Sequence, residues 1–455
     1  MLRVLELPAV RSAAFEEEQT VAVVLVFRVK SAAGAIRRAL RSAFGFWLLF
    51  CLLRCLRGDE SMAFINGANF GNWLVLEKWM SPQTFAQSDS TDEFYLPQTL
   101  SDDAYRNRIA QHRAEYISER DFVLLKGMGI NSVRIPVPYF IFGDRPPFIG
   151  CTTELDNALN WAAHYGMTVL IDLHTAPLGQ NGFDNGGIQG VCQWSQHPEE
   201  VEFVLTVLER LAQRYGQHPA LYGIEILNEP ITENMWKVMD LQKRYPARDP
   251  ALGAASKPNT LEFLREFYLQ AYARMRPHLP QGKKIVFHDG FELMAWQDFM
   301  CDQTKFPDVV LDTHQYLMMA EMTGVEQKLE TYLSYLQQQL MPQYREVCSK
   351  HEVICGEWCL FNSLACGYDT KGGQSILNGV VAAADTPRMS EDERREIYRE
   401  LCRAQMAIWQ LGAGHYYWNY KILFDTVSTN TWQGWDSWDL GRCAAFGWFV
   451  GPDAK

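Results

Sequence analysis

Residues 221–230 read LYGIEILNEP, an apolar run rich in Ile and Leu that ends in Asn228, Glu229 and Pro230. The ring of Pro230 fixes φ and removes a backbone donor, so a strand formed by this run must stop there. A carboxylate, Glu229, therefore stands at the carboxyl end of a buried strand. A second glutamate, Glu357, ends the run EVICGEW in the same way, well over a hundred residues later.

Eight runs of this kind follow one another along the chain, each bounded by turn residues and separated by stretches with helical spacing. In SERDFVLLKGMG, for example, Ser118 and Asp121 predict a helix start, and Gly127 and Gly129 predict its end. Strands that alternate with helices over a few hundred residues predict an α/β fold, a single (β/α)8 TIM barrel. The predicted strands are 64–70, 131–137, 167–174, 221–228, 283–290, 308–316, 352–358 and 414–420.

Polar residues gather at the carboxyl ends of these runs, which is the rim where barrels of this fold build their active sites. Scattered polar residues would fall equally often in mid-strand, where a buried charge is costly unless it is paired. We therefore expect one site at this rim. Its candidates are Arg134, His174, Asn228, Glu229, His288, Asp289, His314, Tyr316, Glu357 and Trp418.

Glu229 and Glu357 suit the hydrolysis of a glycosidic bond, which needs one carboxyl to protonate the leaving oxygen and another to attack the anomeric carbon or activate water. Alone, Asn-Glu-Pro also fits an ordinary strand-to-loop turn, and a Glu before a Trp is commonplace. As the acid, Glu229 needs a pKa raised by burial and by the charge of Glu357. Glu357 needs the reverse, and we expect Arg134 and Tyr316 to hold it ionised through hydrogen bonds.

From about Phe64 to about Lys421 the chain resembles glycoside hydrolase family 5, of the cellulase superfamily, and in detail its exo-1,3-β-glucanase branch. The resemblance implies that Glu229 is the acid/base and Glu357 the nucleophile of a retaining β-glycosidase that acts on β-glucans, with Arg134, Asn228, Tyr316 and His314 in support. The motifs that carry it, in the family's order, are GANFGNWLVLEKW, VRIPVPYF, IDLHTAPLGQNGFDN, GIEILNEP, HDGF, GEW and YYWNYK.

The same resemblance implies contacts to the terminal sugar, with Trp418 as the surface on which its ring stacks. Phe183 and Phe291 correspond to an aromatic clamp at the entrance, although an aromatic after a strand is as often a packing residue. His288 and Asp289 are interpreted as braces of a strand end, and Trp73, Trp79, Trp194 and Trp296 as structural. The expected sugar contacts are Glu77, His174, Asp184, Asn185, Asn228 and His314.

Three departures from the exo-glucanase pattern keep the substrate open. The turn TAPLGQ after His174 has fewer glycines than the family prefers, the stretch GGIQGVCQW follows Asn185, and the segment after Trp418 lacks the acidic residue that commonly follows Lys421. An exo-β-mannosidase, or another family 5 β-glycosidase that acts on a glycan core, is therefore an alternative with the same glutamates. A glycan-binding protein without catalysis is a further alternative.

Residues 1–61 differ from the rest, with nine Lys and Arg against six Asp and Glu, whereas the chain as a whole carries a net charge of −12. The apolar run from Phe44 to Leu53 has the length of a signal peptide, but no small-residue cleavage site follows it. We expect either a spurious extension upstream of a start at Met62, with a cytoplasmic enzyme, or an export signal or anchor. Residues 62–455 are the predicted catalytic domain.

An acidic chain with a pI near 5.4 argues against a nucleic-acid partner and suits a neutral oligo- or polysaccharide. Eleven cysteines without paired spacing, among them Cys355 and Cys359 beside Glu357, predict buried thiols. No His and Cys set has zinc spacing, and no glycine-rich phosphate loop occurs, so neither a metal nor a cofactor is expected. No stable membrane partner is expected for residues 62–455.

Overall fold

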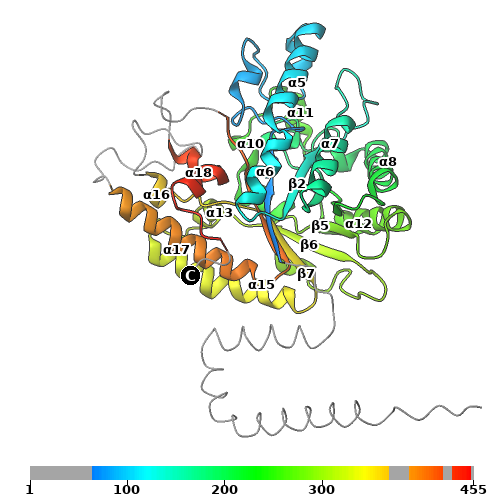
Figure 1. Cartoon of the computed structure of the whole chain (residues 1–455). Helices are drawn as coiled ribbons and strands as arrows, with labels where there is room; N and C mark the ends of the chain where they lie inside the picture. Colours follow the sequence, from blue (N-terminus) through cyan, green and yellow to red (C-terminus); the bar gives the residue numbers. More distant parts are fainter. Residues whose placement is uncertain (1–63, 368–388, 424–432, 452–455) are drawn as a thin grey trace, which may run out of the picture. The chain divides into compact units, whose positions relative to one another are not determined.

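The structure is a computed structural model that describes residues 64–367, 389–423 and 433–451 (Figure 1). The predicted amino-terminal segment 1–61 lies outside the described residues, as do residues 424–432 of the segment that follows Trp418. In the described part of the chain, no helix has the length and apolar character needed to cross a membrane.

Every predicted strand forms, and the strands pair in parallel and in chain order to close a barrel. The first and last strands complete the circle, with Ile65 opposite Gly414. The predicted (β/α)8 barrel is therefore confirmed. The strands are β1 (Ile65–Asn69), β2 (Ser132–Val137), β3 (Thr168–Leu173), β4 (Leu221–Glu225), β5 (Lys284–His288), β6 (Val309–His314), β7 (Glu352–Trp358) and β8 (Gly414–Tyr417).

Helices surround the barrel (Figure 1), and the helix start predicted at Ser118 and Asp121 is confirmed. Ser118 and Asp121 form a reciprocal capping box at one helix, and Ser390 and Glu393 do the same at another. The longer helices are α5 (Asp102–Tyr116), α6 (Glu119–Gly127), α7 (Thr152–His164), α8 (Pro198–Tyr215), α12 (Leu261–Met275), α15 (Met341–Cys348) and α17 (Glu391–Trp409). The shorter ones are α4 (Leu96–Thr99), α9 (Glu233–Val238), α10 (Leu241–Arg244), α11 (Pro250–Ala255), α13 (Leu317–Met322), α14 (Leu329–Tyr335), α16 (Ser363–Gly367) and α18 (Leu440–Ala445).

The interior of the barrel is layered, with an apolar layer at the amino-terminal ends of the strands. Above this layer lies the fully buried side chain of Arg134, surrounded by carboxylates. The polar layer lies directly beneath the carboxyl-terminal rim and supports the side chains that stand there. The apolar layer consists of Ile65, Leu170, Tyr222, Val286, Val310, Ile354 and Tyr416.

Two strands shift register as they reach the rim. The pairing of β6 with β7 is irregular between Thr313 and His314, and that of β7 with β8 between Cys355 and Trp358. Such bulges turn a strand locally and re-aim the side chains beside them. The two irregularities lie at His314 and beside Glu357, where the regular strand pairing is interrupted.

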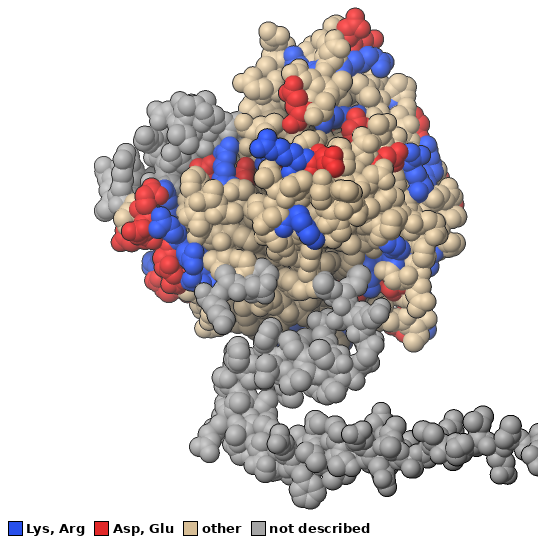
Figure 2. Space-filling model, viewed as in Figure 1, with Lys and Arg blue, Asp and Glu red and all other residues tan. Residues whose placement is uncertain are grey.

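Acidic and basic side chains are interspersed on the face of the molecule seen in Figure 2, where Asp and Glu lie beside Lys and Arg over α17. Ion pairs within this helix, such as Arg395 with Asp392 and Arg403 with Glu396, account for the alternation. The cysteines of the described part are all free thiols, and most of them are buried, as the sequence predicts.

Candidate active site

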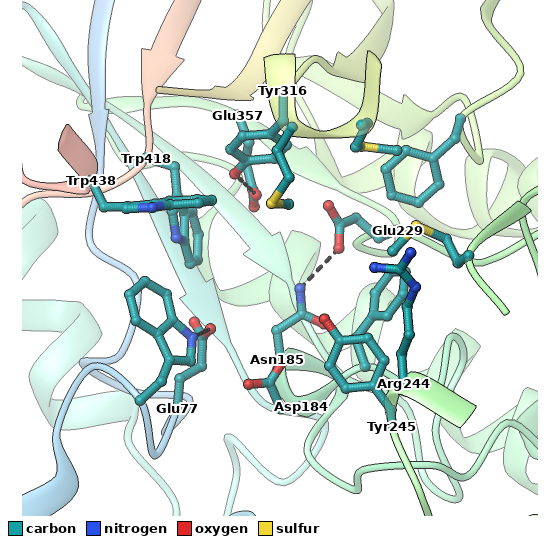
Figure 3. A pocket seen from close by; sticks show the side chains of 16 residues that line it. Glu77, Asp184, Asn185, Glu229, Arg244, Tyr245, Tyr316, Glu357, Trp418 and Trp438 are labelled. Atoms are coloured by element: carbon teal, nitrogen blue, oxygen red, sulfur yellow. Dashed lines mark hydrogen bonds between the residues drawn. The ribbon is translucent and has the colours of Figure 1, made fainter. Parts of the chain in front are cut away.

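A cavity of about 240 Å³ lies at the carboxyl ends of the barrel strands, where the sequence predicts the site. Glu229 points into it from the turn after β4 and Glu357 from the end of β7, and their carboxylates face each other across the space (Figure 3). Its lining residues are Glu77, Trp79, Phe183, Asp184, Asn185, Glu229, Met239, Arg244, Tyr245, Phe291, Tyr316, Met318, Met319, Glu357, Trp418 and Trp438.

Glu229 owes its direction to an unusual backbone. Its φ is 44°, in the left-handed region that a non-glycine residue rarely occupies, and Pro230 follows it directly. Hydrogen bonds fix the preceding residue: the Asn228 amide donates to the Leu173 carbonyl at 3.0 Å, and Nε2 of Gln180 donates to the Asn228 carbonyl at 3.0 Å. The strained conformation persists because these contacts hold the residue directly before Glu229 in place. Asn185 then donates to Oε2 of Glu229 at 2.8 Å.

Glu357 accepts the two hydrogen bonds that the sequence predicts for it. Nη1 of Arg134 donates to Oε1 at 2.9 Å. The Tyr316 hydroxyl donates to Oε2 at 2.8 Å, as Figure 3 shows. The guanidinium also donates to Glu225 at 2.7 Å and to the side-chain oxygen of Asn228 at 2.8 Å. Arg134 thereby ties the ends of β2, β4 and β7 together beneath the cavity, and it fixes the orientation of the Glu357 carboxylate.

His314 limits the separation of the two glutamates. Its Nδ1 lies 2.8 Å from Oε1 of Glu229 and 3.5 Å from Oε2 of Glu357. Because both oxygens are measured from the same nitrogen, the distance between Oε1 of Glu229 and Oε2 of Glu357 cannot exceed the sum of 2.8 Å and 3.5 Å. Carboxyl pairs of inverting glycosidases stand roughly 6.5–9.5 Å apart, and those of retaining enzymes about 5–5.5 Å. The geometry fits the retaining class.

The sequence predicts a raised pKa for Glu229 and a lowered pKa for Glu357, and for the free protein this prediction is wrong. Burial raises the pKa of Glu229, but the hydrogen bond and positive charge of His314 outweigh it, and the pKa of Glu229 lies below its ordinary value. Burial, with the charge of Glu229, leaves the pKa of Glu357 raised in spite of His314 and Arg134. Sequence reasoning missed the physical cause, which is that an imidazolium lies against the expected acid.

His314 can carry this charge because acidic groups surround it. Burial disfavours an imidazolium, yet the charges of Glu357 and Asp312 and the hydrogen bond to Glu229 raise the pKa of His314 well above its ordinary value. His314 and Glu229 lie 2.8 Å apart, so a single proton can reside on either side chain. A proton shared in this way belongs to the pair rather than to either residue.

One end of the cavity combines carboxylates with indole rings, around Glu77, Asp184 and Trp418 (Figure 3). Burial and the nearby charge of Asp184 raise the pKa of Glu77 well above its ordinary value. Burial also raises the pKa of Asp184, to about 6. Oε1 of Glu77 is buried without a hydrogen-bond partner among the described residues. A ligand that brings hydroxyl groups would satisfy it.

Two tryptophans of this end were not predicted as site residues. Trp79, interpreted from the sequence as structural, lines the cavity and donates from Nε1 to Glu77 at 2.8 Å, so that interpretation is wrong. Its position two residues after Glu77 was the available signal. Trp438 packs against Trp79 and Tyr316 with ring centroids 5.7 Å and 5.3 Å apart. It lies twenty residues beyond Trp418, and no pattern in the sequence singles it out.

Arg244 and Tyr245 were also missed, and they lie beside Glu229 at the other end of the cavity (Figure 3). They come from α10 and its C-cap, in the long connection between β4 and β5. Phe183 and Phe291, the predicted clamp, do lie together at this end, with ring centroids 6.3 Å apart and an interplanar angle of 75°. The tertiary structure brings this connection over the cavity, and no local motif announces it.

Some predicted sugar contacts lie behind the cavity wall. His174 is fully buried, with Nδ1 2.5 Å from Asp172 and its ring stacked on that of Trp418 at 5.7 Å. Asn228 accepts from Arg134 and stands 3.5 Å from Nε2 of His174. Neither residue lines the cavity, so both support Trp418 and Arg134 from behind.

His288 and Asp289 brace the end of β5, as interpreted from the sequence. Nδ1 of His288 accepts from the Gly290 amide at 2.9 Å, and Asp289 accepts from the Phe291 amide at 2.8 Å. Among the other tryptophans that were interpreted as structural, Trp73, Trp194 and Trp296 are buried in the main core.

Two groups of described residues bring three potential metal ligands within 4.8 Å of one another: Glu229 with His288 and His314, and Glu225 with Asp312 and His314. In the first group Nδ1 of His288 already accepts a hydrogen bond, and the neutral ring carries its proton on Nε2, so no lone pair is left for a metal. In the second group Glu225 is bonded to Arg134.

The chain matches the family model "Cellulase (glycosyl hydrolase family 5)" over residues 108–376. A relative from Emericella nidulans, named probable glucan 1,3-beta-glucosidase A, is 30% identical over 83% of this chain and 88% of its own length. Glucan 1,3-beta-glucosidase 2 of Wickerhamomyces anomalus is 28% identical over 85% of this chain and 88% of its own.

Among solved structures, a rutinosidase from Aspergillus niger is similar to this chain with a TM-score of 0.60 at 21% identity. The similarity covers 86% of this chain and 99% of that one. At this level of identity the match supports the barrel fold alone.

Proposed function

The chain belongs to glycoside hydrolase family 5, and on that premise we propose that it is an exo-acting β-glucosidase that hydrolyses β-1,3-glucans with retention of configuration. Residues 62–455 would form its catalytic unit. The observation that carries the proposal is the position of His314 between two facing carboxylates, because it keeps Glu229 and Glu357 within the range of a double displacement. The names of the relatives supply the β-1,3-glucan.

In the first step Glu357 attacks the anomeric carbon while Glu229 gives its proton to the departing oxygen. A covalent glycosyl-enzyme forms, and the free glucan chain leaves as an alcohol. Water then attacks from the same face that the chain has vacated, loses its proton to Glu229 and releases Glu357. The proton of the first step comes from the Glu229–His314 pair, in the tautomer that places it on Glu229.

Two features of the cavity favour a single terminal sugar beside the bond. Its volume of about 240 Å³ lies below the roughly 300–1,000 Å³ usual for drug-sized ligands. Oε1 of Glu77 and Nε1 of Trp438 are buried and lack hydrogen-bond partners among the described residues, so they provide an acceptor and a donor for sugar hydroxyls. The indole rings supply flat surfaces for the C–H face of the ring.

The test is the hydrolysis of laminari-oligosaccharides followed by NMR, with a β-mannoside of N-acetylglucosamine in parallel. Release of glucose one unit at a time, first as the β-anomer, is the expected result. Release of the α-anomer would contradict the retaining assignment. Mannose release with the laminari-oligosaccharides intact would favour the exo-β-mannosidase alternative, with Glu229 and Glu357 in the same roles. Activity on neither would contradict the proposed function.

A further inference from the structure

A second hollow of about 130 Å³ lies next to the cavity and is lined mainly by apolar side chains. They come from α9 and its C-cap, from α13, and from the turn after β5. We call this feature the methionine groove and define it by Met235, Val238, Met239, Phe291, Met319 and Met322.

The methionine groove is continuous with the cavity on the side of Glu229. Met239, Phe291, Tyr316 and Met319 line both hollows. His314, which lies 2.8 Å from Glu229, forms part of the groove wall. A general acid stands beside the oxygen that it protonates, so the group attached to that oxygen extends past Glu229. The groove therefore lies where the leaving group of a substrate would be.

Four polar side chains of the groove wall already have hydrogen-bond partners, whereas no described residue bonds to the hydroxyl of the fifth, Tyr335. Nε2 of Gln315 donates to Thr313 at 2.8 Å, and the Thr323 hydroxyl donates to the Ala320 carbonyl at 2.8 Å. The Tyr316 hydroxyl is bonded to Glu357, and His314 to Glu229. A sugar buried here would lose the hydration of its hydroxyls and find few partners, which costs free energy for each unpaired group.

A hydrocarbon chain meets no such penalty, and methionine is suited to receive it. Its unbranched, polarizable side chain adapts to ligands of irregular shape. Val238 is 39% exposed, so the groove opens to solvent and a chain longer than the groove could leave there. We propose that the methionine groove is a leaving-group subsite for a hydrocarbon chain, and that the enzyme hydrolyses β-glucosides of apolar alcohols. This rests on the proposed function.

The experiment compares kcat/KM for butyl, hexyl and octyl β-D-glucosides, each below its micellar concentration, with methyl β-D-glucoside and laminaribiose as references. The alcohols from butanol to octanol have nearly the same basicity, so a trend among them reports binding rather than leaving-group chemistry. We expect kcat/KM to rise about two- to four-fold per added methylene, since about 0.8 kcal/mol accompanies each buried CH₂. The rise should level off once the groove is filled.

Met322→Gln should flatten this trend, whereas Met322→Leu should keep it. Val238→Gln changes an exposed residue at the rim and provides a second variant with little risk to folding. Met341→Gln, at the start of α15 in the outer helix layer, is the matched control and should show the wild-type trend. The ratio of octyl to methyl β-glucoside is the measured quantity for each variant.

The outcomes separate the two proposals. Cleavage of laminaribiose with no dependence on chain length would overturn the subsite and leave the proposed function intact. A chain-length trend that survives in both Met322→Gln and Val238→Gln would overturn its location in the methionine groove. Failure to cleave any of the glucosides, laminaribiose included, would overturn the proposed function and the inference that rests on it.

Discussion

Nδ1 of His314 lies 2.8 Å from Oε1 of Glu229, and both side chains are buried. The contact puts a basic group against the carboxyl that is proposed to deliver a proton. We infer that the free protein holds that proton on the pair, and that the proposed acid is protonated in only one of the pair's two tautomers.

The two glutamates should respond differently to azide. In Glu229→Ala the glycosyl-enzyme still forms from a substrate with a good leaving group, such as 2,4-dinitrophenyl β-glucoside, and azide then gives β-glucosyl azide after two inversions. In Glu357→Ala azide attacks directly and gives the α-azide. Without azide, Glu229→Ala should lose about 10²–10⁴-fold on laminaribiose. NMR of the products distinguishes the two azide anomers. An α-azide from Glu229→Ala and a β-azide from Glu357→Ala would reverse the assignments of the two residues.

Replacement of His314 by Asn should move the basic limb of the pH profile of kcat/KM to lower pH. When one proton can reside on either Glu229 or His314, the apparent pKa of the pair is higher than the pKa that Glu229 would have alone. The reason is that the tautomer with the proton on His314 adds to the protonated population. The Asn side chain is neutral and leaves only Glu229 to hold the proton. Initial rates between pH 4 and pH 9 provide the measurement. A basic limb at the wild-type position would show that the proton is not shared.

Gly71→Ala should disturb Trp418 without touching the substrate. A Cβ at Gly71 would stand 2.5 Å from Cη2 of Trp418. The backbone cannot retreat, because Asn419 accepts from the Gly71 amide at 2.8 Å and donates to its carbonyl at 3.0 Å. We expect kcat/KM to fall about 10–100-fold on every substrate, since small displacements of binding groups are costly.

The matched control is Gly127→Ala at the end of α6, where a Cβ would meet nothing within 4 Å. It should retain wild-type activity. A crystal structure of Gly71→Ala with Trp418 unmoved would contradict the explanation, whatever the rate.

Glu93→Gln should stabilise the protein at neutral pH. Burial raises the pKa of Glu93 from its ordinary value of 4.5 to about 7, so the folded state binds a proton that the unfolded state releases. The free energy of unfolding must then decrease as pH rises from about 4.5 to about 7. Glutamine keeps an acceptor for the Leu76 amide, 3.0 Å away, and removes the cost of ionisation. At pH 8 the gain should reach up to about 3 kcal/mol.

Urea unfolding at pH 5 and pH 8 measures this difference. Asp121→Asn is the control of opposite sign, because the hydrogen bond and charge of Lys421 outweigh burial and hold the pKa of Asp121 below its ordinary value. Asp121 therefore stabilises the folded state above its unfolded pKa, and the stabilisation is lost as pH falls through the folded pKa. An unchanged pH dependence in Glu93→Gln would contradict the prediction.

The barrel could be predicted because each strand carries its own evidence. Val, Ile and Leu in short runs, bounded by turn residues, specify a buried parallel strand locally, and eight such runs with helices between them leave few alternatives. Candidates at strand ends, such as Arg134 and Tyr316, could be predicted for the same reason, and both contact Glu357 as expected. The strand period and the closure of the barrel place these ends together.

The residues that were missed come from long connections. Arg244 and Tyr245 follow β4 by about twenty residues, and Trp438 follows β8 by a similar interval. No hydrophobic period links these residues to the rim, so their place over the cavity depends on contacts with distant parts of the chain. The pKa values were missed for a related reason. The charge that decides them, on His314, comes from a strand remote in sequence from Glu229.

By itself the sequence determined the barrel, its rim and the pair of glutamates, because strand formation and side-chain alternation depend on neighbouring residues. Only the tertiary structure decided that His314 lies against Glu229, that Trp79 and Trp438 line the cavity, and that methionines from α9 and α13 meet beside it. These features depend on distances between side chains from different strands and loops. Electrostatic and packing energies vary steeply with those distances, and the order of residues along the chain does not contain them.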